Sequence, residues 1–128
     1  LRIDLYGDHR NEFFVFAEAI VWESWVVIGF GYHVYLVGIQ DRTVRTFRLP
    51  DYFGRLYKAY GCLIVASASR LLRIEPDGSQ SWISDEVGID GVEVERIDSQ
   101  TIIGVGEWDP PGGWKPFRLD AATGKRMD

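Results

Sequence analysis

The sequence predicts an all-β fold of antiparallel four-stranded meanders, arranged in about three repeats. Short runs rich in Val, Ile, Phe, Trp and Tyr alternate with Gly, Asp, Ser and Pro, which is the pattern of strands and turns. No segment keeps apolar residues at helical spacing for three turns. The pattern also repeats, because the apolar run that begins at Cys62 lies 37 positions after a similar run that begins at Trp25. A period of this length with several strands per unit is typical of β-repeat arrays.

Two strand signals stand in the N-terminal part of the chain. Residues 1–6 alternate apolar and polar side chains, which predicts a half-buried strand. Residues 13–22 are apolar almost without interruption, which predicts a strand buried on both faces. The first repeat covers residues 18–50, and its four strands are expected in AEAIVWE, WVVIGFG, HVYLVGI and TVRTFRL.

The second and third repeats follow the same order. The second covers residues 55–84, with strands expected in RLYKAY, CLIVASA, RLLRIE and SQSWIS. Its Asp77-Gly78 pair favours a tight hairpin in which the glycine has a positive φ. The third covers residues 91–128, with strands expected in GVEVERI, TIIGVGE and KPFRLD and a short stub at residues 125–128. We expect residues 1–128 to form a single all-β domain.

The second strand of each repeat carries small residues at matching places. The pairs are Gly29 and Gly31, Ala66 and Ala68, and Gly104 and Gly106. A glycine inside a strand weakens the strand unless another part of the chain must approach closely. We therefore interpret these positions as places where neighbouring sheets pack together around a shared axis, with ordinary strand packing as the alternative.

The outer hairpins carry a resemblance to a known family. LLRIEPDGSQSW and FRLDAATGK resemble the outer hairpins of β-propeller blades, in particular quinoprotein-type and WD40-like repeats, and Asp120 to Lys125 is the closest match. The chain departs from that pattern in three ways. It has no Gly-His and Trp-Asp signature, Gln40-Asp41-Arg42 replaces a glycine turn, and Met127 stands where a Trp usually follows the turn. The resemblance implies blade-like architecture and carries over no functional residue.

Three blades are too few to close a propeller, which needs at least four. Open sheet ends present unpaired backbone groups and invite association. We therefore expect a homo-oligomer, most simply a dimer that combines three and three blades. Completion of the third repeat by residues 1–6, and a β-sandwich or barrel, are the alternatives. The basic segment 41–58 and the acidic segment 85–109 can meet across a two-fold axis, although two solvated faces explain them equally well.

The composition limits which binding partners and which cellular compartment we expect for the protein. The net charge of −5 argues against nucleic acid and against an anionic membrane surface as partners. The longest uncharged run, residues 24–40, is shorter than the roughly 20 residues that a membrane-spanning helix needs. Cys62 is the single cysteine and the N-terminal residues are charged, so we expect no internal disulfide and a cytoplasmic location.

No motif specifies a reaction, a metal or a cofactor. The two histidines, His9 and His33, have no companions at metal-ligand spacing, and we expect neither a metal site nor a cofactor. Glu93 and Glu95 lie two apart in an expected strand, which puts their carboxylates on one face about 7 Å apart. That separation suits the acid and base of an inverting glycosidase, but alternating acidic residues more often mark a wet face.

The loop from Glu107 to Trp114 is the strongest site candidate. It is an insertion relative to the second repeat and offers two Trp rings beside two carboxylates. We expect a non-enzymatic binding and assembly module that holds a protein or small ligand through Trp108, Asp109 and Trp114. Burial of both tryptophans over the end of the core is the structural alternative. The alternative function is a small carbohydrate-active hydrolase or lyase that uses carboxylates among Asp90, Glu93, Glu95, Glu107 and Asp109.

Overall fold

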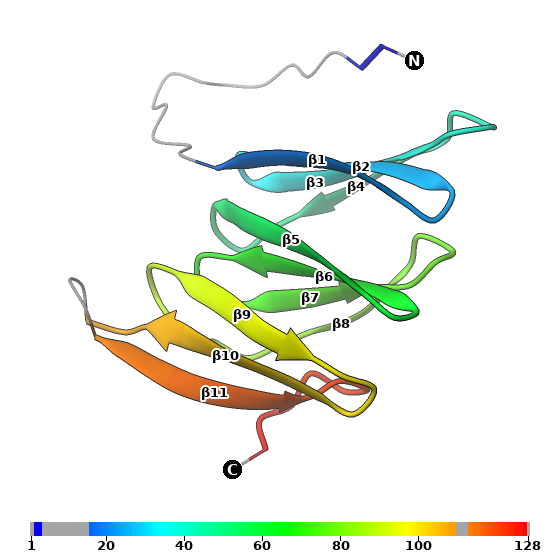
Figure 1. The fold of residues 1–128 in the computed structure, drawn as a ribbon. Helices are drawn as coiled ribbons and strands as arrows, with labels where there is room; N and C mark the ends of the chain where they lie inside the picture. Colours follow the sequence, from blue (N-terminus) through cyan, green and yellow to red (C-terminus); the bar gives the residue numbers. More distant parts are fainter. Residues whose placement is uncertain (1, 4–15, 110–112, 128) are drawn as a thin grey trace.

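The described residues of the protein form three antiparallel β-sheets, stacked in chain order, in the computed structural model (Figure 1). The structure describes residues 2–3, 16–109 and 113–127. The first sheet contains β1 (Ala17–Trp22), β2 (Trp25–Phe30), β3 (His33–Gly38) and β4 (Val44–Arg48). The second contains β5 (Phe53–Ala59), β6 (Cys62–Ser67), β7 (Leu71–Ile74) and β8 (Gln80–Ile83). The third contains β9 (Val92–Ile97), β10 (Thr101–Glu107) and β11 (Trp114–Asp120).

The all-β prediction is confirmed, since the described residues contain no helix and each sheet is an antiparallel meander. The first two sheets have four strands and the third has three. Beyond β11, an isolated bridge joins Leu119 to Arg126, and the amide of Met127 donates to the carbonyl oxygen of Arg118 at 2.8 Å. Except for residues 2 and 3, the strand expected at residues 1–6 lies outside the described residues.

The prediction of a strand buried on both faces is wrong for the described part of residues 13–22. In β1, exposed and half-buried side chains alternate up to Trp22, and Val21 is 58% exposed. The strand that is buried on both faces is β6, whose six residues are all buried. The difference follows from position, because β6 lies inside the middle sheet whereas β1 forms an edge of the first.

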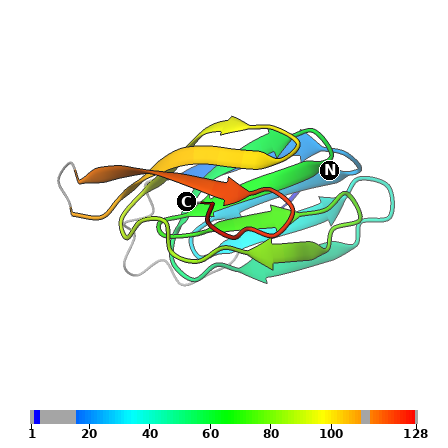
Figure 2. The same cartoon turned by 90° about the horizontal axis from the view of Figure 1, so that it is seen from below.

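Two hydrophobic cores separate the three sheets. The first core lies between the first and second sheets and includes Val27, Leu36 and Leu63. The second lies between the second and third sheets and includes Ile64, Ile102 and Leu119. Neighbouring residues of β6 thus face opposite cores, and the middle sheet is shared by both. Viewed from below, the sheets lie over one another as successive layers, with the third nearest the viewer (Figure 2).

The two junctions between sheets repeat the same backbone hydrogen bonds. In each, the segment that leaves one sheet bonds to residues just past the second strand of that sheet before it enters the next. At the first junction, the amide of Leu49 donates to the carbonyl of Tyr32 and the amide of Phe53 to the carbonyl of Gly31, both at 2.7 Å. At the second junction, the amide of Val87 donates to the carbonyl of Ser69 and the amide of Gly91 to the carbonyl of Ala68, both at 2.8 Å. The sequence repeat is therefore also a repeat of contacts.

At each junction, a side chain of one sheet also accepts a hydrogen bond from a backbone amide on the edge strand of the next sheet. Glu18 in β1 accepts a hydrogen bond from the amide of Leu56 in β5 at 2.9 Å. One sheet further on, the hydroxyl of Tyr57 in β5 accepts one from the amide of Val94 in β9 at 3.1 Å. Since unpaired edge amides cost stability when they are buried, these side chains stabilise the stacking of one sheet on the next.

The small residues in β2 and β10 are places of close approach. A Cβ atom on Gly29 would lie 2.1 Å from Cε1 of Phe53, which begins the next sheet. A Cβ atom on Gly106 would lie 1.6 Å from the carbonyl oxygen of Val87 in the second junction. At both positions a side chain would prevent the neighbouring segment from packing, which explains the glycines.

Candidate functional site

A cleft of about 390 Å³ opens where the second and third sheets meet. Its walls come from the start of the second sheet, the end of β6, the segment that leads into β9 with the start of that strand, the end of β10 and the start of β11. The side chains that matter for its chemistry are Tyr52, Arg55, Tyr57, Asp90, Glu107 and Trp114. A concave site at the junction of two packed units, with aromatic walls and a few polar groups, is the usual form of a ligand pocket.

Glu107 and Trp114 stand side by side in this cleft. They form the last pair of the β10–β11 ladder, so the backbone register sets their positions. Both approach the backbone of Gly91: a Cβ atom there would lie 3.1 Å from Cη2 of Trp114 and 3.8 Å from Oε2 of Glu107. The indole of Trp114 packs on Gly91 and is still 43% exposed. The absence of a side chain on Gly91 therefore allows the Trp114 ring to pack on the backbone of Gly91, beside the Glu107 carboxylate.

Tyr52 and Asp90 form a hydrogen-bonded pair in the same cleft. The hydroxyl of Tyr52 donates to Oδ1 of Asp90 at 2.6 Å. Burial first, and then the hydrogen bond and charge of Asp90, raise the pKa of Tyr52 to about 12. The charges of Asp51 and Glu107 act in the same direction. Tyr52 thus remains a neutral donor at physiological pH, in a region of negative potential.

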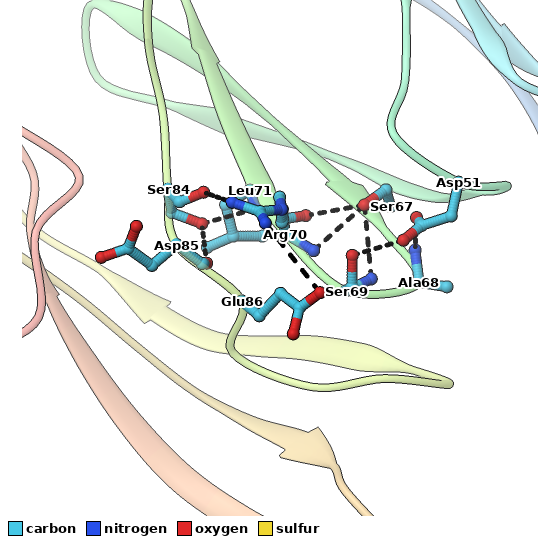
Figure 3. Close-up of polar contacts among 9 residues, drawn as sticks. All are labelled: Asp51, Ser67, Ala68, Ser69, Arg70, Leu71, Ser84, Asp85 and Glu86. Atoms are coloured by element: carbon cyan, nitrogen blue, oxygen red, sulfur yellow. Dashed lines mark hydrogen bonds and ion pairs between the residues drawn. The ribbon is translucent and has the colours of Figure 1, made fainter.

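A polar network fixes the wall of the cleft at the end of β6 (Figure 3). Asp51 accepts hydrogen bonds from the amide of Ala68 at 2.8 Å and from the hydroxyl of Ser69. The hydroxyl oxygen of Ser67 accepts from the amide of Arg70 at 3.0 Å, and Nη1 of Arg70 donates to the carbonyl oxygen of Ser84 at 2.9 Å. Because these groups satisfy one another and the backbone, the network holds the β6–β7 turn against the incoming segment.

The structure brings some of the predicted site residues together and leaves others apart. Asp90, Glu93, Glu107 and Trp114 all line the cleft. Glu95, Trp108 and Asp109 do not belong to its lining. Two backbone hydrogen bonds close the base of the loop instead. The amide of Trp108 donates to the carbonyl oxygen of Gly113 at 2.9 Å, and the amide of Gly113 donates to the carbonyl oxygen of Asp109 at 3.0 Å. The rest of that loop, residues 110–112, lies outside the described residues.

A β-bulge in β9 separates Glu93 from Glu95. The ladder pairs Glu93 with Val105 and Arg96 with Ile103, and its register shifts between Ile103 and Gly104. Glu95 is left as the extra residue, because Val94 pairs with Gly104 and the next residue in register is Arg96. The expected spacing of the two carboxylates assumed an uninterrupted alternation, which the bulge breaks.

Sequence reasoning missed Tyr52, Arg55 and Tyr57 as members of the site. Arg55 and Tyr57 belong to the second repeat and Tyr52 lies just before it, whereas the predicted site residues lay in the third repeat or, for Asp90, directly before it. The repeat itself carried the missing signal, because stacked sheets place the first strand of one repeat beside the first strand of the next, as the contacts between β5 and β9 show.

The described residues contain no group of three or more His, Cys, Asp or Glu side chains arranged to hold a metal ion. None of them forms a helix with the length and hydropathy needed to cross a membrane. In comparisons with known proteins, neither a protein-family model nor a curated protein matches the sequence.

Proposed function

We propose that the chain is a non-enzymatic binding and assembly module whose ligand occupies the cleft at Trp114. The observation that carries this proposal is the convergence of Trp114, Glu107 and the Tyr52–Asp90 pair on one cavity between two sheets. Aromatic rings supply contact area, and the polar groups around them fix the orientation of a bound molecule. The ligand is a small molecule or an extended side chain from a protein partner.

Assembly is the second part of the proposal. The stack contains two complete four-stranded sheets and a three-stranded one, and its two junctions repeat the same contacts. Such a stack fits the blades of a propeller, which a second copy of the chain completes as three and three. The exposed valines of the first sheet, Val21 and Val44, support association through the open end of the stack.

A carbohydrate-active hydrolase or lyase is the second candidate. It is favoured by the finding that Asp90, Glu93 and Glu107 line the cavity that holds Trp114. Two carboxylates on either side of a bound sugar, with an aromatic ring beneath it, are the usual equipment of such an enzyme.

One experiment separates the two candidates. Isotope-labelled full-length protein is screened by NMR against a set of small molecules, oligosaccharides and short peptides, and each oligosaccharide is also assayed for cleavage. We expect hits to shift the resonances of Gly91 and Trp114, and Trp114→Ala to abolish those shifts. Trp108→Ala, outside the cleft lining, is the matched control and should retain binding.

The outcomes assign the function. Binding at the cleft without cleavage supports the module. Cleavage by the wild type that Glu107→Gln abolishes, with binding retained, supports the enzyme. Hits that map away from Gly91, or binding unchanged by Trp114→Ala, contradict the assignment of this cleft as the site.

A further inference from the structure

The space beside Gly91 has a particular chemical character. Within 4 Å of the point where a Cβ atom of Gly91 would lie are Cη2 of Trp114, at 3.1 Å, and Oε2 of Glu107, at 3.8 Å. An aromatic ring attracts a cation to its face, and a carboxylate attracts it by charge and hydrogen bonding. A positively charged group in the cleft, in contact with the Trp114 ring and the Glu107 carboxylate, satisfies both of these neighbours.

The electrostatics of the cleft agree with that geometry. Its lining includes three carboxylates, those of Asp90, Glu93 and Glu107, against one guanidinium, that of Arg55. Because the cleft is partly withdrawn from water, the interaction of a bound charge with these groups is screened less than at an open surface.

We propose that the cleft binds an organic cation, an alkylammonium or guanidinium group, which lies against the Trp114 ring and pairs with the Glu107 carboxylate. The inference rests on the proposed binding function and names the chemistry of its ligand. The cation belongs either to a free small molecule or to a Lys or Arg side chain of a peptide. An aliphatic stem leading to the charge would lie along the aromatic walls made by Tyr57 and Phe16.

The test uses four probes of similar size at constant ionic strength: n-butylammonium, n-butylguanidinium, butyrate and n-butanol. The indole N–H resonance of Trp114, assigned with Trp114→Phe, and the amide of Gly91 report binding. We expect saturable shifts with both cations, and an affinity at least tenfold higher for butylammonium than for butanol. Butyrate should bind more weakly than butanol.

Single substitutions test which residues of the cleft recognise the positive charge. Glu107→Gln should reduce the affinity for butylammonium at least fivefold and leave that for butanol unchanged, whereas the control Glu95→Gln, outside the cleft lining, should change neither. Gly91→Ala places a methyl group 3.1 Å from Cη2 of Trp114, which should displace the ring and weaken the binding of both cations. The dispersion of each variant's amide spectrum shows whether it is folded.

A pair of capped tripeptides distinguishes the source of the cation. One contains lysine and the other norleucine, at the same central position. Tighter binding of the lysine peptide than of butylammonium indicates a peptide ligand, and weaker binding indicates a small molecule. Butyrate or butanol binding as tightly as butylammonium overturns the inference but leaves a binding site at the cleft. Failure of every probe overturns the inference as well, and the broader screen then decides whether the cleft binds any ligand.

Discussion

Glycine has two separate roles in the turns of this protein. Gly61, Gly78 and Gly124 all have left-handed backbone, with φ values of 78°, 85° and 73°. A Cβ atom on Gly61 would meet no other atom within 4 Å, whereas one on Gly124 would lie 2.4 Å from Cε3 of Trp82. In the latter turn the glycine allows the backbone conformation and also admits an indole, whose Nε1 donates to the carbonyl oxygen of Ala121 at 3.0 Å.

Comparing two substitutions separates these roles. We expect Gly61→Ala to lower the free energy of unfolding by about 1 kcal/mol, because only the left-handed backbone is strained. Gly124→Ala should lower it by about 2–4 kcal/mol, since the methyl group also displaces Trp82 from the turn. Urea unfolding of both variants measures the difference. Equal losses would mean that packing of Trp82 on the turn contributes nothing to stability.

At the scale of elements, one side-chain device recurs in the hairpin turns. An aspartate carboxylate accepts a hydrogen bond from the backbone amide two residues further on, as expected for Asx turns. The acceptors and donors are Asp41 with Thr43 (3.0 Å), Asp77 with Ser79 (2.9 Å), Asp98 with Gln100 (2.9 Å) and Asp120 with Ala122 (2.8 Å). In the β9–β10 turn, bonds from the amides of Gln100 and Thr101 and the hydroxyl of Thr101 hold the pKa of Asp98 below its usual 3.8.

This device makes stability depend on acid pH. Because the folded-state pKa of Asp98 lies below the unfolded value of 3.8, its contribution is present above that pH and is lost as the pH falls through the folded-state pKa. Asp98→Asn keeps an oxygen acceptor but does not titrate, so we expect its stability to fall less steeply than that of the wild type below pH 4. Asp98→Ala removes the acceptor and should be less stable at pH 7 as well. Urea midpoints between pH 2.5 and 7 test both expectations, and a wild-type slope in Asp98→Asn would refute the link.

Local chemistry made the strands and turns predictable. The Asp77-Gly78 hairpin and the small residues of β2 and β10 follow from turn preferences and steric limits that act over a few residues. The bulge at Glu95 was not predictable, because it depends on how β9 pairs with β10. The second wall of the cleft was missed for a similar reason, since Tyr57 reaches β9 only after two sheets have stacked.

At the scale of the whole molecule, the open end of the stack differs from its junctions. The face of the first sheet turned away from the second is crossed by a row of four valines, one from each strand. Their register pairs Val21 with Val26, Val26 with Val37, and Val37 with Val44. The first core contains none of the four. Val21 and Val44, at the ends of the row, are 58% and 61% exposed, whereas Val26 is half-buried and Val37 is already buried. An apolar row across a terminal sheet is the surface that a further sheet would cover in a repeat array.

The proposed association through this face makes a specific prediction about mass. Light scattering on a size-exclusion column should give twice the 14.6 kDa of one chain, and dilution should dissociate the dimer. Val21→Lys combined with Val44→Lys should give a monomer at all concentrations, because two ammonium groups would lose water in an apolar interface. Tyr60→Lys is the matched control: Tyr60 is fully exposed in the β5–β6 turn, so the variant should remain a dimer.

If the basic segment 41–58 and the acidic segment 85–109 contribute across the interface, the dimer should also weaken as salt is raised. A wild-type monomer across the whole dilution series would exclude two-chain closure, and the stack would then exist with its first sheet open.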